Sequence, residues 1–351
     1  MTPPPAPRSG MPPYVEHGGD ISGRHPADAL NIRMYAFALE VSRDHVDRYC
    51  EHLFNKPSGG REHWRGVCDY VLVTFVDIPT MASCDPADSW LGIVAERESA
   101  IWMPVADEHR CRMAWAIPYM FVDSDMALVG GRETYGFPKQ IGTITLLRTA
   151  TVPKLLQVDA LSLRTYGRDK KARVHEVMRV TNASIENEPL VRQWTTPFDM
   201  MRDLALLVVD PDDRDRRSPV ADLLSLLRHP FRDISRALGD VGAALLLADQ
   251  LSEANVSMVL LKQFRDAQYA TSACYQAVVE VSNSVTAFRG GGLLPSGYEL
   301  DINDLASEPI LRELGVRGTP QHPRVGFWLE FDFFVHLGEI LFEAHTAPRR
   351  Q

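Results

Sequence analysis

The sequence has few lysines and no block of positive charge. Only six of its 37 basic side chains are lysine, and the formal net charge is -9 with a pI of about 5.7. Proteins that bind nucleic acid rely on clustered lysine and arginine to neutralise backbone phosphates. We therefore expect no nucleic-acid partner.

Long apolar runs are also missing. No stretch approaches the roughly 18 consecutive apolar residues that a membrane-spanning helix requires, and residues 1–13 are rich in proline and lack the apolar core of a secretory signal. The five cysteines are odd in number and irregularly spaced, without a CxxC pair, which favours reduced thiols. The expectation is a soluble cytoplasmic protein that makes no membrane contact.

The common catalytic and cofactor motifs are absent from the sequence. There is no HExxH pattern and no zinc-type spacing of cysteine and histidine, so we expect no metal site. There is no GxSxG elbow and no GxxxxGK[ST] loop. The run Gly290-Gly291-Gly292 departs from a dinucleotide fingerprint, and indicates a flexible turn or a close approach of the backbone to a ligand.

Hydrophobic patterning predicts an α+β chain that is mainly β. Residues 1–28 form a proline- and glycine-rich tail that we expect to be disordered. Strand patterns follow from about residue 30, among them residues 70–78, 91–95, 100–105 and 112–122, and a short helix over residues 124–129 should break at Gly130-Gly131. Leucine and alanine at helical spacing mark a helical insertion at about residues 185–255. Strand patterns then resume, which argues for a single domain over residues 29–345.

One segment, residues 130–142, combines four glycines, a proline and a lysine. Pro138 fixes its own φ and biases Phe137 toward an extended conformation, so the backbone that carries Lys139 is constrained. Tyr135, Phe137 and Ile141 indicate an apolar setting. Burial disfavours an ammonium group, and a neutral lysine attacks carbonyl carbon. An exposed lysine in a glycine-rich turn is the alternative.

This segment resembles the GRE…PKK region of the acetoacetate decarboxylases. The resemblance is carried by Gly131-Arg132-Glu133 followed by Pro138-Lys139, with Tyr119-Met120-Phe121-Val122-Asp123 before it. The run from Phe288 to Leu300 is similar to the C-terminal region of longer members. The resemblance implies a β-barrel or cone core with peripheral helices, of the acetoacetate decarboxylase-like type, and a tendency to form homo-oligomers.

The resemblance also implies roles for individual residues. Lys139 matches the lysine that forms a Schiff base, whereas Gln140 replaces the second lysine of the family motif. Glu96 matches the family's glutamate proton shuttle, with Glu98 as a possible substitute, and a second family acidic residue falls on Val76 or Asp77. Arg33 matches an arginine that faces the substrate. We expect the substrate to be bordered by the side chains of Arg33, Gln140, Tyr135 and Phe137.

The expected function is Schiff-base chemistry on a small-molecule keto acid or other carbonyl compound, without a metal or organic cofactor. The reaction is decarboxylation or another cleavage or condensation through a Lys139 iminium. One alternative is an aldolase–dehydratase or cyclase that acts on pyruvate or enal-type carbonyls. A further alternative is a small-molecule binding protein without turnover.

Overall fold

The computed structural model describes residues 13–15, 23–88, 90–107, 109–149, 152–182, 192–208 and 241–344. Most of the predicted tail and the middle of the predicted helical insertion lie outside these residues. The part of the tail that is described is not featureless, because the first strand already begins at Ala27. None of the described helices is both long enough and apolar enough to cross a membrane.

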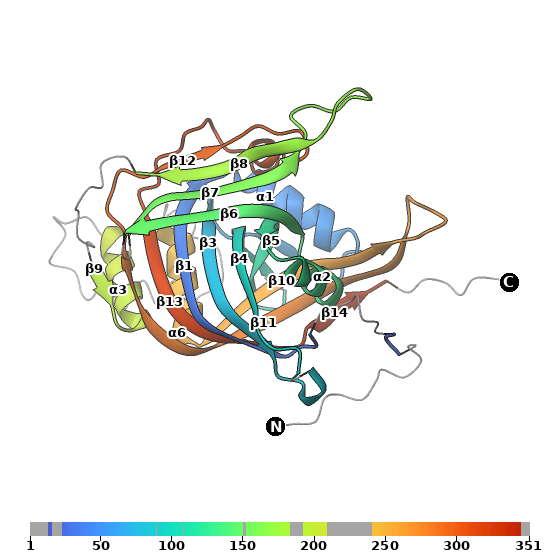
Figure 1. Ribbon diagram of the computed structural model, residues 1–351, viewed down its shortest axis with the longest axis horizontal. Coiled ribbons are helices and arrows are strands. Elements are labelled where there is room, and N and C mark those ends of the chain that lie inside the picture. Colours follow the sequence, from blue (N-terminus) through green and yellow to red (C-terminus); the bar gives the residue numbers. More distant parts are fainter. Residues whose placement is uncertain are drawn as a thin grey trace.

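The central feature is a closed ring of strands (Figure 1). Antiparallel pairing of β4 with β5 joins the two ends of a continuous path, so the strands form a barrel without a free edge inside the ring. In order around the ring the strands are β5 (Arg112–Val122), β10 (Asn255–Arg265), β11 (Ala273–Leu293), β13 (Gly326–Val335), β1 (Ala27–Glu40), β3 (Tyr70–Ser83) and β4 (Val94–Asp107).

A second group of strands extends from the ring and lies across its outer face (Figure 1). It begins where β6 pairs in parallel with β5 and continues by antiparallel pairing. Its members are β6 (Lys139–Thr149), β7 (Val152–Ser162), β8 (Arg173–Thr181) and β12 (Glu299–Ile302). Short strands complete the edges: β2 (Trp64–Gly66), β9 (Arg192–Trp194) and β14 (Glu339–Glu343).

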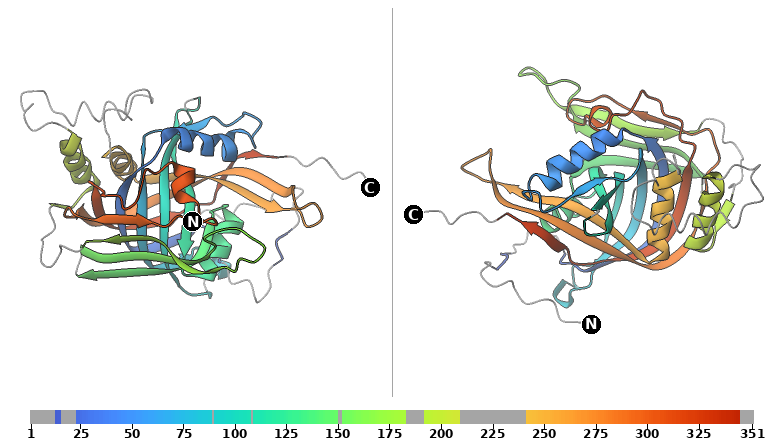
Figure 2. Two further views of the ribbon diagram at one scale, coloured as in Figure 1. Left: turned by 90° about the horizontal axis from the view of Figure 1, so that it is seen from above. Right: turned by 180° about the vertical axis from the view of Figure 1, so that it is seen from behind.

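The helices lie around the ring rather than between repeated strands. Helix α1 (Arg43–Cys50) continues as the π-helix η1 (Glu51–Asn55), and α7 (Ile310–Leu314) packs beside it. Helix α6 (Gly242–Ser252) packs against strands β3, β4 and β10, with α3 (Pro197–Val208) on its other side (Figure 2). The chain is thus α+β and mainly β, as the sequence predicts.

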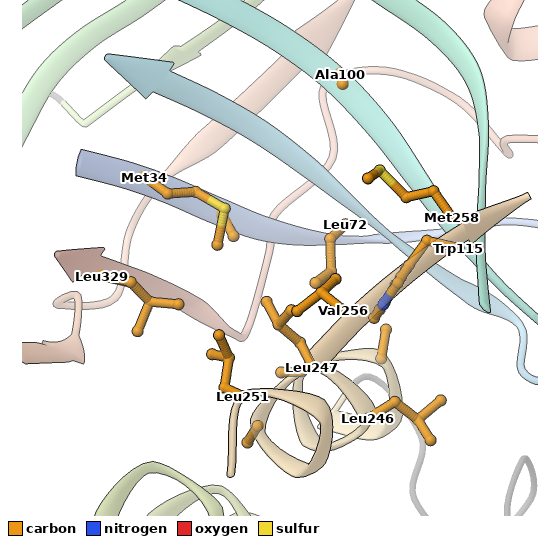
Figure 3. Packing of buried hydrophobic residues seen from close by; sticks show 14 of the residues in the cluster. Met34, Leu72, Ala100, Trp115, Leu246, Leu247, Leu251, Val256, Met258 and Leu329 are labelled. Carbon is orange, nitrogen blue, oxygen red and sulfur yellow. The ribbon is translucent and has the colours of Figure 1, made fainter. Parts of the chain in front are cut away.

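Two apolar cores follow from this arrangement. One fills the ring and includes α6, whose residues 242–248 are apolar on all sides and therefore suit a buried position. Figure 3 shows its Leu247 and Leu251 among side chains from strands of the ring. The other core lies between the outer face of the ring, the second group of strands and α1.

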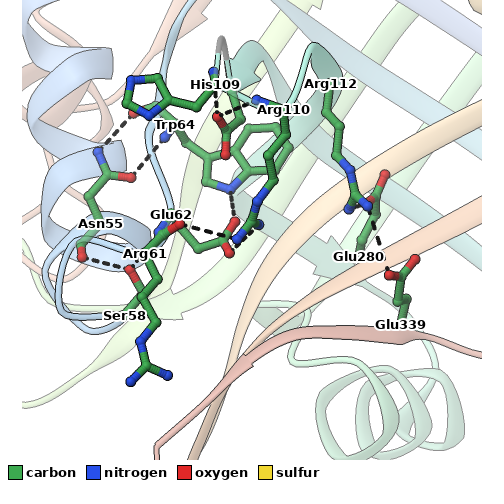
Figure 4. Close-up of polar contacts among 11 residues, drawn as sticks. Asn55, Ser58, Arg61, Glu62, Trp64, His109, Arg110, Arg112, Glu280 and Glu339 are labelled. Atoms are coloured by element: carbon green, nitrogen blue, oxygen red, sulfur yellow. Dashed lines mark hydrogen bonds and ion pairs between the residues drawn. The ribbon is translucent and has the colours of Figure 1, made fainter.

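Polar contacts fix the turn between β4 and β5 to the chain that follows η1 (Figure 4). The fully buried carboxylate of Glu62 accepts a hydrogen bond from the Trp64 indole at 3.0 Å and pairs with the Arg110 guanidinium. Asn55 bonds both backbone groups of Trp64, at 2.8 and 2.9 Å. This buried charge is paired and hydrogen-bonded, as burial requires, and we assign it a structural role.

Three local predictions differ from the structure. Residues 91–95 and 100–105 were expected as separate strands, but a single strand, β4, begins at Val94 and includes residues 100–105, because Glu96, Arg97 and Glu98 continue the strand rather than turning. A helix was expected to break at Gly130-Gly131, whereas α2 (Asp125–Thr134) runs through both. Gly290-Gly291-Gly292 is strand rather than turn, because it pairs with β13 and β9. The 3-10 turn η2 (Pro86–Asp88) was not anticipated.

Candidate active site

The candidate site lies where β4, β5 and β6 run side by side. Glu96 and Glu98 are two residues apart on β4, so both side chains point to the same face of the ring. Lys139 is the first residue of β6 and pairs with Met120 of β5, which lines the same cavity. The register therefore brings one amine and two carboxyl groups together from segments about 40 residues apart.

Lys139 is held inside the protein with its amine next to a carboxylate. Its side chain is 9% exposed, and Nζ lies 3.4 Å from Oε2 of Glu96, whose side chain is 1% exposed. The Arg132 guanidinium donates a hydrogen bond to the Lys139 carbonyl at 3.0 Å, which fixes the start of β6. The geometry thus gives the amine a nearby proton acceptor in an interior setting.

Gly131 provides the space for this lysine. A Cβ atom at residue 131 would lie 2.8 Å from Cδ, 2.9 Å from Cε and 3.3 Å from Nζ of Lys139. A glycine inside a helix costs roughly 1 kcal/mol relative to alanine. The helix continues through this position, and the missing side chain lets α2 lie directly against the lysine.

The carboxyl group of Glu98 has a strongly shifted pKa. Its pKa is raised to about 7, first because burial disfavours the carboxylate and second because the Glu96 carboxylate is near, while Lys139 acts in the opposite direction. Near neutral pH, Glu98 is therefore poised between a proton donor and a proton acceptor. A group of this kind suits general acid–base catalysis.

The three groups open into a cavity of about 190 Å³ with a mostly apolar lining. Tyr135 and Phe137 line it, and Nζ of Lys139 lies 5.8 Å from the centroid of the Phe137 ring. The Tyr135 hydroxyl donates a hydrogen bond to the His336 carbonyl at 2.7 Å, which orients the ring. The structure therefore places Lys139, Glu96, Tyr135 and Phe137 around one cavity.

His25 also lines the cavity, although the sequence placed it in the tail. Its ring meets that of Tyr135 edge to face at 4.8 Å. The pKa of His25 is lowered to about 4, mainly by burial and then by Lys139, so the imidazole is neutral at pH 7. The only sequence signal near it is the strand pattern that starts shortly afterwards, which is too weak to identify a site residue.

Two expected substrate-binding residues lie elsewhere. Arg33 alternates with Met34 on β1; Met34 lines the cavity, whereas the Arg33 guanidinium pairs with Glu330. Gln140 follows Lys139 on β6, so its side chain points to the opposite face of the strand. The structure does not bring either residue to the amine.

Asp77 is also turned away from the cavity. Its neighbours Val76 and Ile78 line the cavity, whereas Asp77 forms an ion pair with Arg97 at 3.4 Å. Glu98, the possible substitute for Glu96, lines the cavity together with Glu96. Among the described residues, no group of three histidine, cysteine, aspartate or glutamate side chains could hold a metal ion.

The comparison with known protein families agrees with this geometry. The family model described as acetoacetate decarboxylase (ADC) matches residues 56–193, a range that contains Glu96, Glu98 and Lys139. This part of the chain is therefore similar to the acetoacetate decarboxylase family. No match was found among curated protein sequences.

Solved structures of acetoacetate decarboxylase-like enzymes share the fold. The acetoacetate decarboxylase from Legionella pneumophila subsp. pneumophila str. Philadelphia 1 is 14% identical with a TM-score of 0.56, over 95% of this chain and 92% of that one. The enduracididine biosynthesis enzyme MppR complexed with pyruvate is 16% identical with a TM-score of 0.52, over 90% of each chain. MppR has also been solved with the condensation product of pyruvate and imidazole 4-carboxaldehyde.

Proposed function

We propose that this acetoacetate decarboxylase-like protein is an enzyme that forms a Schiff base between Lys139 and a carbonyl substrate, and uses it to break or make a carbon–carbon bond. The observation that carries the proposal is the buried Lys139 amine, 3.4 Å from the Glu96 carboxylate and inside an apolar cavity. The similarity of residues 56–193 to the acetoacetate decarboxylase family supports an enzymatic role. The expected homo-oligomer stays a prediction.

Formation of the Schiff base needs one proton acceptor and one proton donor. Glu96 accepts a proton from the Lys139 ammonium, and the free amine adds to the carbonyl carbon. The carbonyl oxygen then takes one proton from the nitrogen and one from the Glu98 carboxyl group, and leaves as water. The product is an iminium between Nζ and the former carbonyl carbon, with the nitrogen carrying the positive charge.

The iminium then accepts an electron pair from a neighbouring bond. When the bond joins the adjacent carbon to a carboxylate, carbon dioxide leaves and an enamine remains. When it is another carbon–carbon bond, the step is a retro-aldol cleavage, and the reverse step is a condensation. After decarboxylation or retro-aldol cleavage, a proton is returned to the enamine carbon from Glu96, which holds the proton that it took from the Lys139 ammonium.

Borohydride trapping tests the proposal directly. We expect incubation with pyruvate, acetoacetate or an aldehyde, followed by reduction, to give a stable adduct that mass spectrometry locates on Lys139. The adduct should disappear in Lys139→Gln. Lys262→Gln is the matched control, because burial also lowers the pKa of Lys262, but its side chain lies outside the cavity, over the Phe264 and Tyr275 rings.

An adduct on Lys262 in place of Lys139 would contradict the proposal. Reversible ligand binding without an adduct on Lys139, for every carbonyl compound tested, would instead indicate a binding protein. The reaction itself is identified by comparing carbon dioxide release from 3-oxo acids with product formation from pyruvate and aldehydes.

A further inference from the structure

The cavity offers more room than the three reactive groups use. An apolar cavity of about 150 Å³ in another protein holds benzene, and this one has about 190 Å³. It can accommodate a six-membered ring together with a short chain that carries the carbonyl group.

The lining suits an apolar ring rather than a second charged group. Five methionines border the cavity, and they adapt to the shape of a ligand and make favourable sulfur–aromatic contacts. Aromatic side chains complete the apolar wall. The lining residues that argue for this are Met34, Met81, Met120, Met126, Met258 and Phe331.

The charges in the lining give no separate site for a carboxylate. Among the described lining residues, the basic side chains are those of Lys139, Arg24 and His25, and His25 is neutral at pH 7. Arg24 is paired with Asp88 at 3.0 Å and is largely turned to solvent. Lys139 is the reacting amine, and Glu96 beside it would repel an anionic ligand. A distal carboxylate would therefore be buried without a cationic partner, which is costly.

Three polar atoms of lining residues lack a hydrogen-bond partner in the described structure: Nδ1 of His25, Oδ1 of Asn283 and Nε1 of Trp102. Of these, the indole nitrogen is a donor only. Nε1 of Trp102 is buried and has no hydrogen-bond acceptor in the described structure. Trp102 is two residues beyond Ala100 on the same face of β4, and Ala100 pairs with Met120, which pairs with Lys139. This places the indole roughly 7 Å along the strand from the position level with the lysine, about one ring away.

Resting on the proposed function, we infer that the substrate of Lys139 is an uncharged, ring-sized apolar aldehyde or ketone, with an oxygen atom at its far end that accepts a hydrogen bond from Nε1 of Trp102. The ring occupies the methionine-lined part of the cavity, and the carbonyl carbon faces Nζ. A buried indole N–H that finds no acceptor is unfavourable, so the ligand oxygen improves both binding and selectivity.

A competition experiment with four carbonyl compounds tests the inference. The full-length protein is incubated with equal concentrations of pyruvate, acetoacetate, cinnamaldehyde and 4-methoxycinnamaldehyde, reduced with borohydride, and analysed for adducts on Lys139. We expect the two aromatic aldehydes to dominate by at least about tenfold. We expect the methoxy compound to exceed the unsubstituted one by about fivefold, the ratio typical of one neutral hydrogen bond.

Two tryptophan variants separate the hydrogen bond from general packing. Trp102→Phe should abolish the preference for the methoxy compound while cinnamaldehyde still forms the adduct, which also shows that the variant is folded. Trp328→Phe should keep the preference, because Nε1 of Trp328 is likewise buried without a partner, but the side chain lies outside the cavity.

The outcomes distinguish the inference from the proposed function. Adducts on Lys139 that favour pyruvate or acetoacetate, or a methoxy preference that survives in Trp102→Phe, would overturn the inference and leave the Schiff-base proposal standing. The absence of any adduct on Lys139 would overturn both.

Discussion

Glu98 is the residue at which the site and the stability of the fold are linked. Its carboxyl group is buried beside Glu96, and its pKa is raised to about 7. A carboxyl group whose pKa is higher in the folded state favours folding when it is protonated. This contribution is complete below about pH 4.5 and is lost as the pH rises to about 7.

We therefore predict that Glu98→Gln flattens the pH dependence of stability. Relative to the variant, the wild-type protein should lose roughly 3 kcal/mol of unfolding free energy between pH 4.5 and 8, since one pKa unit corresponds to about 1.4 kcal/mol. Urea unfolding at several pH values measures this. The exposed Glu299→Gln is the control, and parallel curves for wild type and Glu98→Gln would contradict the prediction.

The residues of the site were predictable to different degrees. The resemblance named Lys139 and Glu96, with Glu98 as an alternative to Glu96, and all three line the same cavity. Arg33 and Gln140 were expected at the cavity but do not line it. Neighbouring residues of a strand point to opposite faces, and a sequence motif does not show which face a residue occupies. Whether Trp102 and His25 line the cavity depends on which strands lie next to one another, and a single sequence does not show that.

Helix α2 shows how an element can serve a side chain on another element. It continues through Gly130 and Gly131, and the bare backbone at Gly131 lies against the Lys139 side chain. The sequence suggested a break here because glycine pairs usually interrupt helices. In the structure the helix continues through both glycines, because α2 packs against Lys139 of β6.

We predict that Gly131→Ala separates reactivity from stability. The added methyl group should displace the Lys139 side chain and slow adduct formation by roughly 10- to 100-fold, the effect expected of a misplaced reacting group. Stability should change little, because alanine in a helix gains about 0.5–1 kcal/mol, which offsets the crowding. Trapping rates and thermal unfolding measure the two effects.

Thr134→Ala, on the same helix but outside the cavity, is the control for this experiment. Full reactivity of Gly131→Ala would show that the lysine does not depend on the space at residue 131. The same variant would then have to be read as a change in helix propensity alone.

Most strands were visible in the sequence as elements. Residues 112–122 were predicted with the bounds that β5 has, and residues 70–78 lie within β3. β4 was divided in two because Glu-Arg-Glu is polar, although two of those side chains face a cavity and not water. Polarity alone does not distinguish a turn from a strand that lines a site.

At the scale of the whole molecule, α6 belongs to both the core and the site. Leu246 and Leu247 are neighbours on it and each is 3% exposed, but only Leu247 lines the cavity (Figure 3). This pair allows a test in which both substitutions destabilise the fold to a similar degree, but only the one at Leu247 alters the site.

We predict that Leu246→Ala and Leu247→Ala each lower the unfolding free energy by roughly 2–5 kcal/mol, as expected for buried leucine. Only Leu247→Ala should enlarge the substrate cavity and shift adduct formation toward bulkier carbonyl compounds. Chemical denaturation and borohydride trapping with a size series measure this. An equal shift in Leu246→Ala would mean that the effect comes from loosening of the fold.

The closed ring could be anticipated only through the resemblance, since periodicity identifies strands but not their partners. β1 pairs with β13, about 290 residues later in the chain, and β4 closes the ring on β5. Such pairings are set by register and packing between distant segments. They explain why the class of the fold was predictable from patterns and its topology was not.

The pairing of β13 between β11 and β1 also sets when the site can exist during protein synthesis. Until residues 326–335 have left the ribosome, the ring has a gap, and the wall of the cavity that β13 supplies is missing. A nascent or truncated chain therefore carries Lys139 without its enclosure. Proteolytic loss of the last strands should silence the amine chemistry without touching any of the reacting groups.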